Sequence, residues 1–173
     1  MPRAKTLTWT SKGNRLSDGH RRVVKRHVVD RMGIDVEKVD IIQGDTNEVH
    51  FGWGSYGSRS AAVGGSAIAL SVDKVIEKGR KLAAHLLEAS EEDIIFEDGS
   101  FFVQGTPEKV QSWDDIALQS HLAHNLPPGM EPGLNASTFY DPANFTFPFG
   151  THLAVVEVDP KTGMVSLLRY IAV

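Results

Sequence analysis

The chain has 173 residues, of which 41% are hydrophobic and 23% are charged, with no cysteine and a formal net charge of −4. This composition is typical of one globular domain with a core of its own, and its acidic balance argues against a general nucleic-acid binder. The lack of cysteine excludes disulfides and Cys-ligated metal centres, and neither a run of ~20 apolar residues nor a secretory signal is found, so we expect a cytoplasmic chain without a membrane segment.

The first elements in chain order are short. The stretch from Leu7 to Thr10 predicts a strand. Ser17 or Asp18 can then cap a helix whose apolar positions recur at helical spacing up to Met32, and Gly33 is placed to end it. The segment VEKVDIIQGDT predicts a second strand at residues 39–43.

The middle of the chain carries the strongest helix signal. Between about residues 60 and 88 the apolar side chains recur as one stripe of a long helix. Two β-prone runs on either side of Asp98-Gly99 then predict a hairpin, because this dipeptide suits a type I′ turn. A further helix is expected at residues 112–123, with Ser112 as its N-cap.

The last third is loop followed by strands. Residues 125–137 have loop composition, and residues 151–173 predict a second hairpin that turns at residues 159–163. Helices and hairpins are segregated and do not alternate as βαβ units, so we predict the α+β class, with long helices packed on small antiparallel sheets in a single domain, residues 1–173.

A glycine-rich loop precedes the long helix. The stretch FGWGSYGSRSAAVGGSA contains G-x-G-x-x-G at Gly52, Gly54 and Gly57. A Rossmann site needs a buried strand before this motif and an acid about 20 residues later, at the end of a second strand. The preceding segment is polar, and the acid at that distance, Glu77, lies mid-helix. The sequence therefore argues against a Rossmann unit.

The same loop retains the physical features of an anion site. Its glycines let the backbone approach a ligand closely, and Ser58 and Ser60 lie where the first helical N–H groups have no partner within the helix. Arg59 could add a charge, and Gly64 and Gly65 would keep the first turns slim enough to pack against another backbone. The residues alone leave a second interpretation equally open, in which the serines only cap the helix and the glycines only form a turn.

Four segments together resemble a known family: GDT, FGWGSYGSRSAAVGGSAIAL, KLAAHLLEAS and FPFGTHLAVVEVDPKTGMVSLLRYIAV. They are similar, in order, to the molybdenum-binding large subunit of the xanthine dehydrogenase/aldehyde oxidase/carbon monoxide dehydrogenase family, and the G-[ST]-Y-G-S-R-S loop resembles the carbon monoxide dehydrogenase-like branch. The similarity covers a minor part of that subunit, and the chain stops inside an apolar β-like run. We therefore expect a fragment of a longer subunit.

Residues 1–32 diverge from the family pattern. Family members carry a Q-G-Q-G-H-like loop before the first helix, where a glutamine contacts the cofactor. Here the corresponding stretch is RLSDGH, in which Asp18 takes the place of that glutamine while Gly19 and His20 keep the register.

The resemblance implies a molybdopterin site. It implies that the chain binds molybdopterin, in bacterial members usually the cytosine dinucleotide form, with the metal held by the pterin and not by side chains. The cofactor-binding residues implied by the motif are Gly54, Ser55, Tyr56, Gly57, Ser58, Arg59 and Ser60.

The resemblance also implies a reaction and partners. The reaction would be oxidation of an aldehyde, carbon monoxide or a heterocycle-like substrate. The partners would be the remainder of the large subunit, iron–sulfur and flavin subunits, and in addition a second copy in a homo-oligomer. The family's catalytic glutamate lies in a G-x-G-E-like segment that this sequence lacks. We therefore expect neither a catalytic residue nor a metal ligand in this chain, and no activity of the chain alone.

Two other functions stay open. The chain could be a non-enzymatic remnant or assembly module that folds without cofactor, or a phosphate-binding module without molybdenum. His121 and His124 are interpreted as a solvated helix end and not as metal ligands. The aromatic segment at residues 139–150 is interpreted as surface that packs on another domain.

Overall fold

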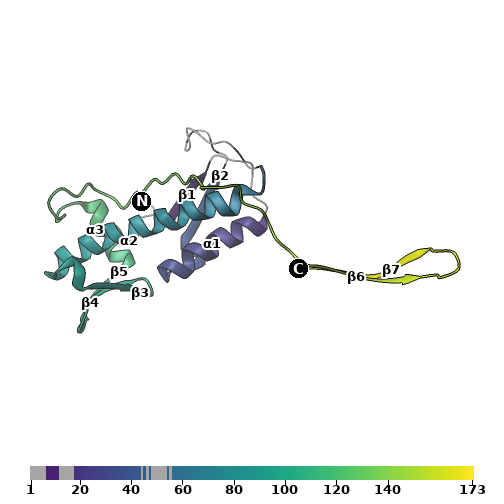
Figure 1. Ribbon diagram of the computed structural model, residues 1–173. Coiled ribbons are helices and arrows are strands. Elements are labelled where there is room, and N and C mark those ends of the chain that lie inside the picture. Colours follow the sequence, from purple (N-terminus) through teal and green to yellow (C-terminus); the bar gives the residue numbers. More distant parts are fainter. Residues whose placement is uncertain (1–6, 12–17, 44, 46, 48–53, 55) are drawn as a thin grey trace.

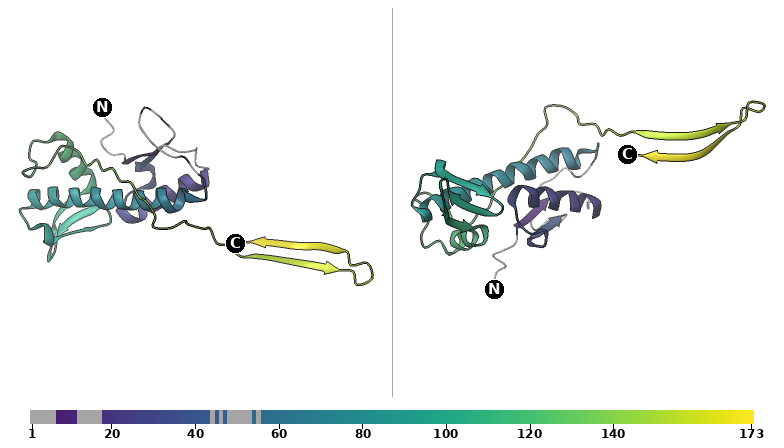
Figure 2. Two further views of the ribbon diagram at one scale, coloured as in Figure 1. Left: turned by 45° about the horizontal axis from the view of Figure 1, so that its top comes forward. Right: turned by 90° about the horizontal axis from the view of Figure 1, so that it is seen from below.

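The computed structural model describes residues 7–11, 18–43, 45, 47, 54 and 56–173. These residues form a body of helices and two small sheets, from which a long β-hairpin projects (Figures 1 and 2). The predicted α+β class is confirmed, since the helices cover small sheets. Whether residues 1–173 are one domain stays a prediction.

The N-terminal elements form a β-α-β unit. Strand β1 (Leu7–Ser11), helix α1 (Asp18–Met32) and strand β2 (Val39–Gln43) follow one another, with a 3₁₀ turn at Val36–Lys38 before β2. The strands pair in parallel, with Leu7 beside Val39. The expectation that no βαβ unit occurs is therefore wrong at this point. A helix between two strands returns the chain to the edge from which the first strand began, so the strands can pair in parallel.

Helix α2 (Ser66–Leu87) is the long helix of the body. It follows a π-helical turn, η2 (Ser60–Gly65). The predicted helix over residues 60–88 is therefore confirmed, except that its first residues are π-helical and not α-helical. The apolar stripe is buried; its members include Ile68, Val72, Val75, Gly79 and Leu82. Glu88 ends the helix in the left-handed conformation.

A three-stranded antiparallel sheet follows α2. Strands β3 (Ile94–Glu97) and β4 (Ser100–Val103) form the predicted hairpin, and Asp98 and Gly99 both have positive φ, as its type I′ turn requires. Strand β5 (Thr106–Ser112) adds to β4, and the sequence did not predict it, because its residues are polar and mostly exposed. A 3₁₀ turn at Glu91–Asp93 precedes the sheet.

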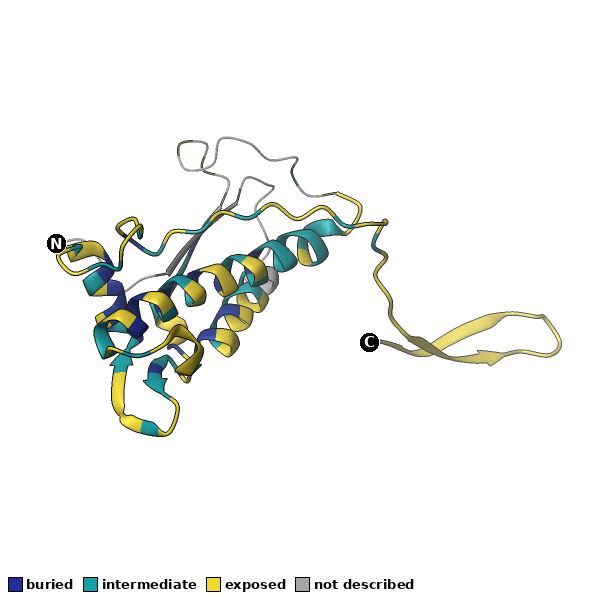
Figure 3. Ribbon diagram, turned by 60° about the vertical axis from the view of Figure 1, so that its left-hand side comes forward, coloured by how far each residue is buried: buried dark blue, intermediate teal, exposed yellow. Residues whose placement is uncertain are grey.

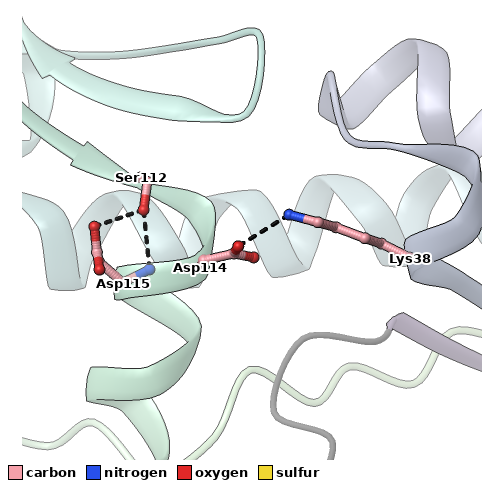
Figure 4. A network of polar contacts seen from close by, with 4 residues as sticks. All are labelled: Lys38, Ser112, Asp114 and Asp115. Carbon is pink, nitrogen blue, oxygen red and sulfur yellow. Dashed lines mark hydrogen bonds and ion pairs between the residues drawn. The ribbon is translucent and has the colours of Figure 1, made fainter.

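Helix α3 (Trp113–Leu122) begins where the sequence predicted. Ser112 is the N-cap, and its Oγ accepts a hydrogen bond from the Asp115 N–H at 3.1 Å. Next to this cap, Lys38 Nζ lies 2.9 Å from Asp114 Oδ2, so the turn before β2 is tied to the start of α3 (Figure 4).

One core joins these elements. It lies where α1, α2 and α3 meet the inner faces of the sheets, and the ribbon of its buried residues is dark blue in Figure 3. The fully buried large side chains in it are Val28, Met32, Val39, Leu82, Phe101 and Ile116. Apolar burial of this kind is the main favourable term in folding.

The remaining chain leaves the body. After α3, residues 123–151 have no helix or strand and run back along α2, where Lys74 Nζ and Lys78 Nζ donate to the carbonyls of Ser137 and Asn135. The predicted second hairpin follows as strands β6 (His152–Val158) and β7 (Val165–Ala172), paired antiparallel.

Candidate functional site

The glycine-rich loop ends in a tight turn before α2. The Arg59 N–H donates to the Tyr56 carbonyl at 3.2 Å, and the two residues between them, Gly57 and Ser58, have φ of +58° and +57°. Positive φ at both central positions is the signature of a type I′ turn. Glycine adopts this conformation freely, whereas serine does so at a cost, so Ser58 is a strained residue of the kind that clusters at binding sites.

A cation lies next to this turn. The Arg59 guanidinium is 5.1 Å from the centroid of the Tyr56 ring, and Arg59 Nη1 donates to Tyr56 Oη at 3.1 Å. Cation–π and hydrogen-bond contacts of this kind hold an arginine in place at a surface. The Tyr56 side chain is exposed and Arg59 is half-buried, so a ligand can reach the ring and part of the arginine.

The start of the helix has an unusual conformation. Residues 60–65 are π-helical, a form that is rare and frequent at functional sites. The N-cap position belongs to Arg59, whose side chain makes no capping bond. Ser58 therefore does not cap the helix, whereas Gly57 does form a turn, as the second interpretation expected. Ser60 is the first residue of η2.

The glycines of this region border open space. A Cβ added at Gly54, Gly57, Gly64 or Gly65 would meet no atom of the described chain within 4 Å. The expected packing of Gly64 and Gly65 against another backbone is therefore not found within the described residues. Instead, as far as the described residues go, the space beside Gly64 and Gly65 is open, which leaves room for a group that lies against the helix backbone.

Helix α1 brings a second N-terminus to the same end. The two helices run in the same direction (Figure 1), Arg31 near the end of α1 forms an ion pair with Asp73 of α2, and α1 contacts η2. The backbone at Asp18 thus lies at the same end of the body as Ser60. Each helix N-terminus carries a partial positive charge, so the two together favour an anion. Residue spacing treated the two helix starts separately, and only the family resemblance implied that the loops before both helices meet at the cofactor.

The structure brings most of the predicted site residues together. Gly54, Tyr56, Gly57, Ser58, Arg59 and Ser60 lie in or next to the turn before α2. Ser55, and Gly52 of the glycine motif, lie outside the described residues.

Two further findings concern the described stretches only. Within them, no group of three His, Asp or Glu side chains is arranged to hold a metal ion. Of the helices that the structure describes, none is both long and apolar enough to cross a membrane.

Comparison with known proteins defines the class. Residues 6–173 match the model of the molybdopterin cofactor-binding domain family. The carbon monoxide dehydrogenase large chain of Hydrogenophaga pseudoflava is 43% identical over 154 residues, which are 89% of this chain and 19% of that one.

Solved structures agree with this. The Cu,Mo-CO dehydrogenase in its carbon monoxide reduced state superposes with a TM-score of 0.85 at 32% identity, over 96% of this chain and 21% of that one. Quinoline 2-oxidoreductase from Pseudomonas putida 86 superposes with a TM-score of 0.81 at 32% identity, again over 96% and 21%.

The chain therefore belongs to the molybdopterin cofactor-binding domain family of molybdenum hydroxylase large subunits, as the resemblance predicted. It spans about a fifth of the length of the relatives it matches.

Proposed function

We propose that this chain forms one side of a molybdopterin cytosine dinucleotide site in a molybdenum hydroxylase large subunit. The observation that carries the proposal is the bare, glycine-lined start of α2, beside a second helix N-terminus, in a chain of this family. The residues proposed to contact the cofactor are Gly54, Ser55, Tyr56, Gly57, Ser58, Arg59 and Ser60.

The chemistry of these groups fits a dinucleotide. Its phosphates are anions, which backbone N–H groups at helix N-termini and a guanidinium bind well. The open space at Gly57, Gly64 and Gly65 lets the ligand reach the backbone itself, which any side chain at these positions would obstruct. The strained φ of Ser58 turns the chain sharply just before the helix begins.

The role of this chain would be positional. When bound, the cofactor supplies the redox centre at which an aldehyde, carbon monoxide or heterocycle-like substrate is oxidised. The residues of the loop bind and orient it, and no residue of this chain is assigned a proton transfer. Two solved relatives, a carbon monoxide dehydrogenase and a quinoline 2-oxidoreductase, match the same segment, which supports a role in holding the cofactor and not in selecting the substrate.

Further parts would complete the enzyme. We assign the catalytic base to large-subunit polypeptide outside this chain, and electron transfer to iron–sulfur and flavin subunits. The chain by itself is then inactive, and its activity can be tested only in such an assembly.

The experiment is a chemical analysis of the chain purified from a bacterial host that makes the molybdenum cofactor. We expect one pterin, measured by its fluorescence, for each molybdenum atom. Hydrolysis of the bound cofactor should release CMP. Release of a different nucleotide would contradict only the cytosine part of the proposal, and molybdopterin binding would stand.

A folded chain that is free of pterin and molybdenum would contradict the proposal and favour the non-enzymatic module. Stabilisation by pyrophosphate or nucleotides of such a pterin-free chain would favour the phosphate-binding module instead.

A further inference from the structure

Residues 139–173, which we call the arm, expose apolar side chains along their whole length. In the extended part, Phe145, Phe147 and Phe149 have exposed fractions of 91%, 83% and 102%. Every residue of β6 and β7 is exposed, including Leu153, Leu167 and Ile171 (Figure 3). Contiguous exposed apolar surface of this kind marks an interaction site.

The outer half of the hairpin has one apolar face. Val156 pairs with Leu167 and Val158 pairs with Val165, and because alternate positions of a strand share a face, these four side chains lie together. Between these two pairs, Glu157 is paired with Ser166 on the opposite face. This half of the hairpin therefore has a face suited to burial and a polar face opposite to it.

The inner half is less one-sided. Leu153 pairs with Ile171 and Val155 with Arg169 on one face, while Tyr170 Oη lies 2.9 Å from His152 Nδ1 on the other. Apolar residues thus occur on both faces of this half.

The body of the molecule does not cover these faces. The hairpin points away from the helices (Figures 1 and 2), and its two strands pair only with each other. A two-stranded hairpin alone in water is marginally stable at best. Its order therefore calls for a partner that buries the apolar face.

We propose that the arm is the docking surface for a further stretch of large-subunit polypeptide, which covers the apolar face of Val156, Val158, Val165 and Leu167. The solved relatives superpose over 96% of this chain, so the superposed part includes the hairpin. The same match covers only 21% of each relative's own chain. The greater part of such a subunit is thus available as the partner.

A second copy of this chain fits the surface less well. A two-fold contact uses one patch on each copy, whereas the arm exposes apolar residues on both faces of its inner half and along the preceding phenylalanines. The proposal rests on the chain acting as part of a large subunit, and it concerns assembly and not cofactor binding.

The test is co-expression of the tagged chain with the part of the Hydrogenophaga pseudoflava carbon monoxide dehydrogenase large chain that does not align with it. We expect affinity capture of this polypeptide in equal amount. The double variant Val156→Ser/Leu167→Ser should lower capture at least tenfold. The matched variant Glu157→Gln/Ser166→Ala, on the opposite face, should capture like the parent chain. The aligned segment of the Hydrogenophaga chain, tagged in the same way, serves as the reference.

Three results would overturn the proposal. One is that this chain does not capture the large-chain polypeptide, whether or not the reference segment captures it. Another is equal capture by both double variants. The third is a dimer of this chain, seen by light scattering, that Val156→Ser/Leu167→Ser disperses.

The thermal midpoint and pterin content of the variants separate this test from the cofactor proposal. Both should stay at the parent values, because the hairpin lies outside the body and away from the glycine loop. If the parent chain and the variants contained no pterin while the parent still captured its partner, the cofactor proposal would be contradicted and the docking proposal would not.

Discussion

The ring of Phe101 in β4 lies directly on Gly79 in the middle of α2. A Cβ at position 79 would stand 2.6 Å from Phe101 Cζ and 3.2 Å from Cε2. Phe101 is fully buried, and its ring centroid lies 4.5 Å from that of Phe96 and 6.2 Å from that of Trp113, so it has no room to retreat. The sheet approaches α2 this closely because residue 79 has no side chain.

We expect Gly79→Ala to destabilise the fold. Alanine favours a helix over glycine by about 1 kcal/mol, but overpacking of a filled core costs about 1–3 kcal/mol, so the net loss should be about 1 kcal/mol in urea unfolding. In a Phe101→Leu background, where the ring is gone, the same substitution should instead raise stability. If Gly79→Ala raised the free energy of unfolding in the parent background, the contact between Gly79 and the Phe101 ring would not be tight.

Gly33 should tolerate alanine even less. Its φ is +62°, and a Cβ there would lie 2.4 Å from the Cα of Asp98, a backbone atom of the β3–β4 turn that cannot rotate away. We expect Gly33→Ala to cost more than 2 kcal/mol, which combines about 1 kcal/mol of strain with the overlap. Gly105→Ala is the control, because φ is +79° there but the space is open. Equal losses in the two variants, measured by chemical unfolding, would contradict the close approach.

Ser112→Ala removes the N-cap of α3. Because the Asp115 N–H then loses its acceptor, we expect a loss of about 1 kcal/mol, and Ser112→Thr should recover most of it. Urea unfolding of the three proteins measures this. A loss shared by the threonine variant would point to packing and not to the hydrogen bond.

The turn of the exposed hairpin should respond to acid. The Asp159 carboxylate accepts hydrogen bonds from the Lys161 N–H at 2.8 Å and Thr162 Oγ1 at 2.7 Å, and these bonds, the first more than the second, lower the pKa of Asp159 below 3.8. Because the pKa of Asp159 is lowered in the folded state, its carboxylate stabilises the turn above pH 3.8. This stabilisation is lost as the pH falls through the folded-state pKa.

We therefore expect the NMR titration of the Asp159 carboxyl to have its midpoint below 3.8, with the Lys161 amide shifting at the same pH. In Asp159→Asn the amide should not shift over this range. A midpoint at or above the ordinary value would mean that these hydrogen bonds do not form in solution.

Local signals allowed most of the fold to be predicted. Helix α3, the turn at Asp98-Gly99 and the end of α1 at Gly33 each depend on neighbouring residues, and the structure confirms them. Strand β5 is polar and is specified only by its pairing with β4, so its own pattern carries no signal. The parallel pairing of β1 with β2 likewise depends on residues far apart in the chain.

The loop at the start of the long helix was predictable in position but not in geometry, and its role as the cofactor site stays a prediction. The glycines and serines indicate a loop at a helix start, and the structure places that loop there. The positive φ of Ser58 and the π-helical turn follow from no residue preference, because serine and alanine favour neither. The neighbouring N-terminus of α1 depends on how the two helices pack, which residue spacing within one helix does not define.

The pterin content of Gly65→Leu, prepared beside the parent chain, tests the site most directly. Gly65 has ordinary helical φ and ψ and open space at its Cβ, so leucine there should leave the thermal midpoint unchanged or raise it. The leucine side chain would fill the space assigned to the cofactor. We predict at least a tenfold loss of bound pterin in Gly65→Leu and none in Lys81→Leu, an exposed position near the far end of the same helix. Equal pterin in all three proteins would contradict the placement of the cofactor at the start of α2.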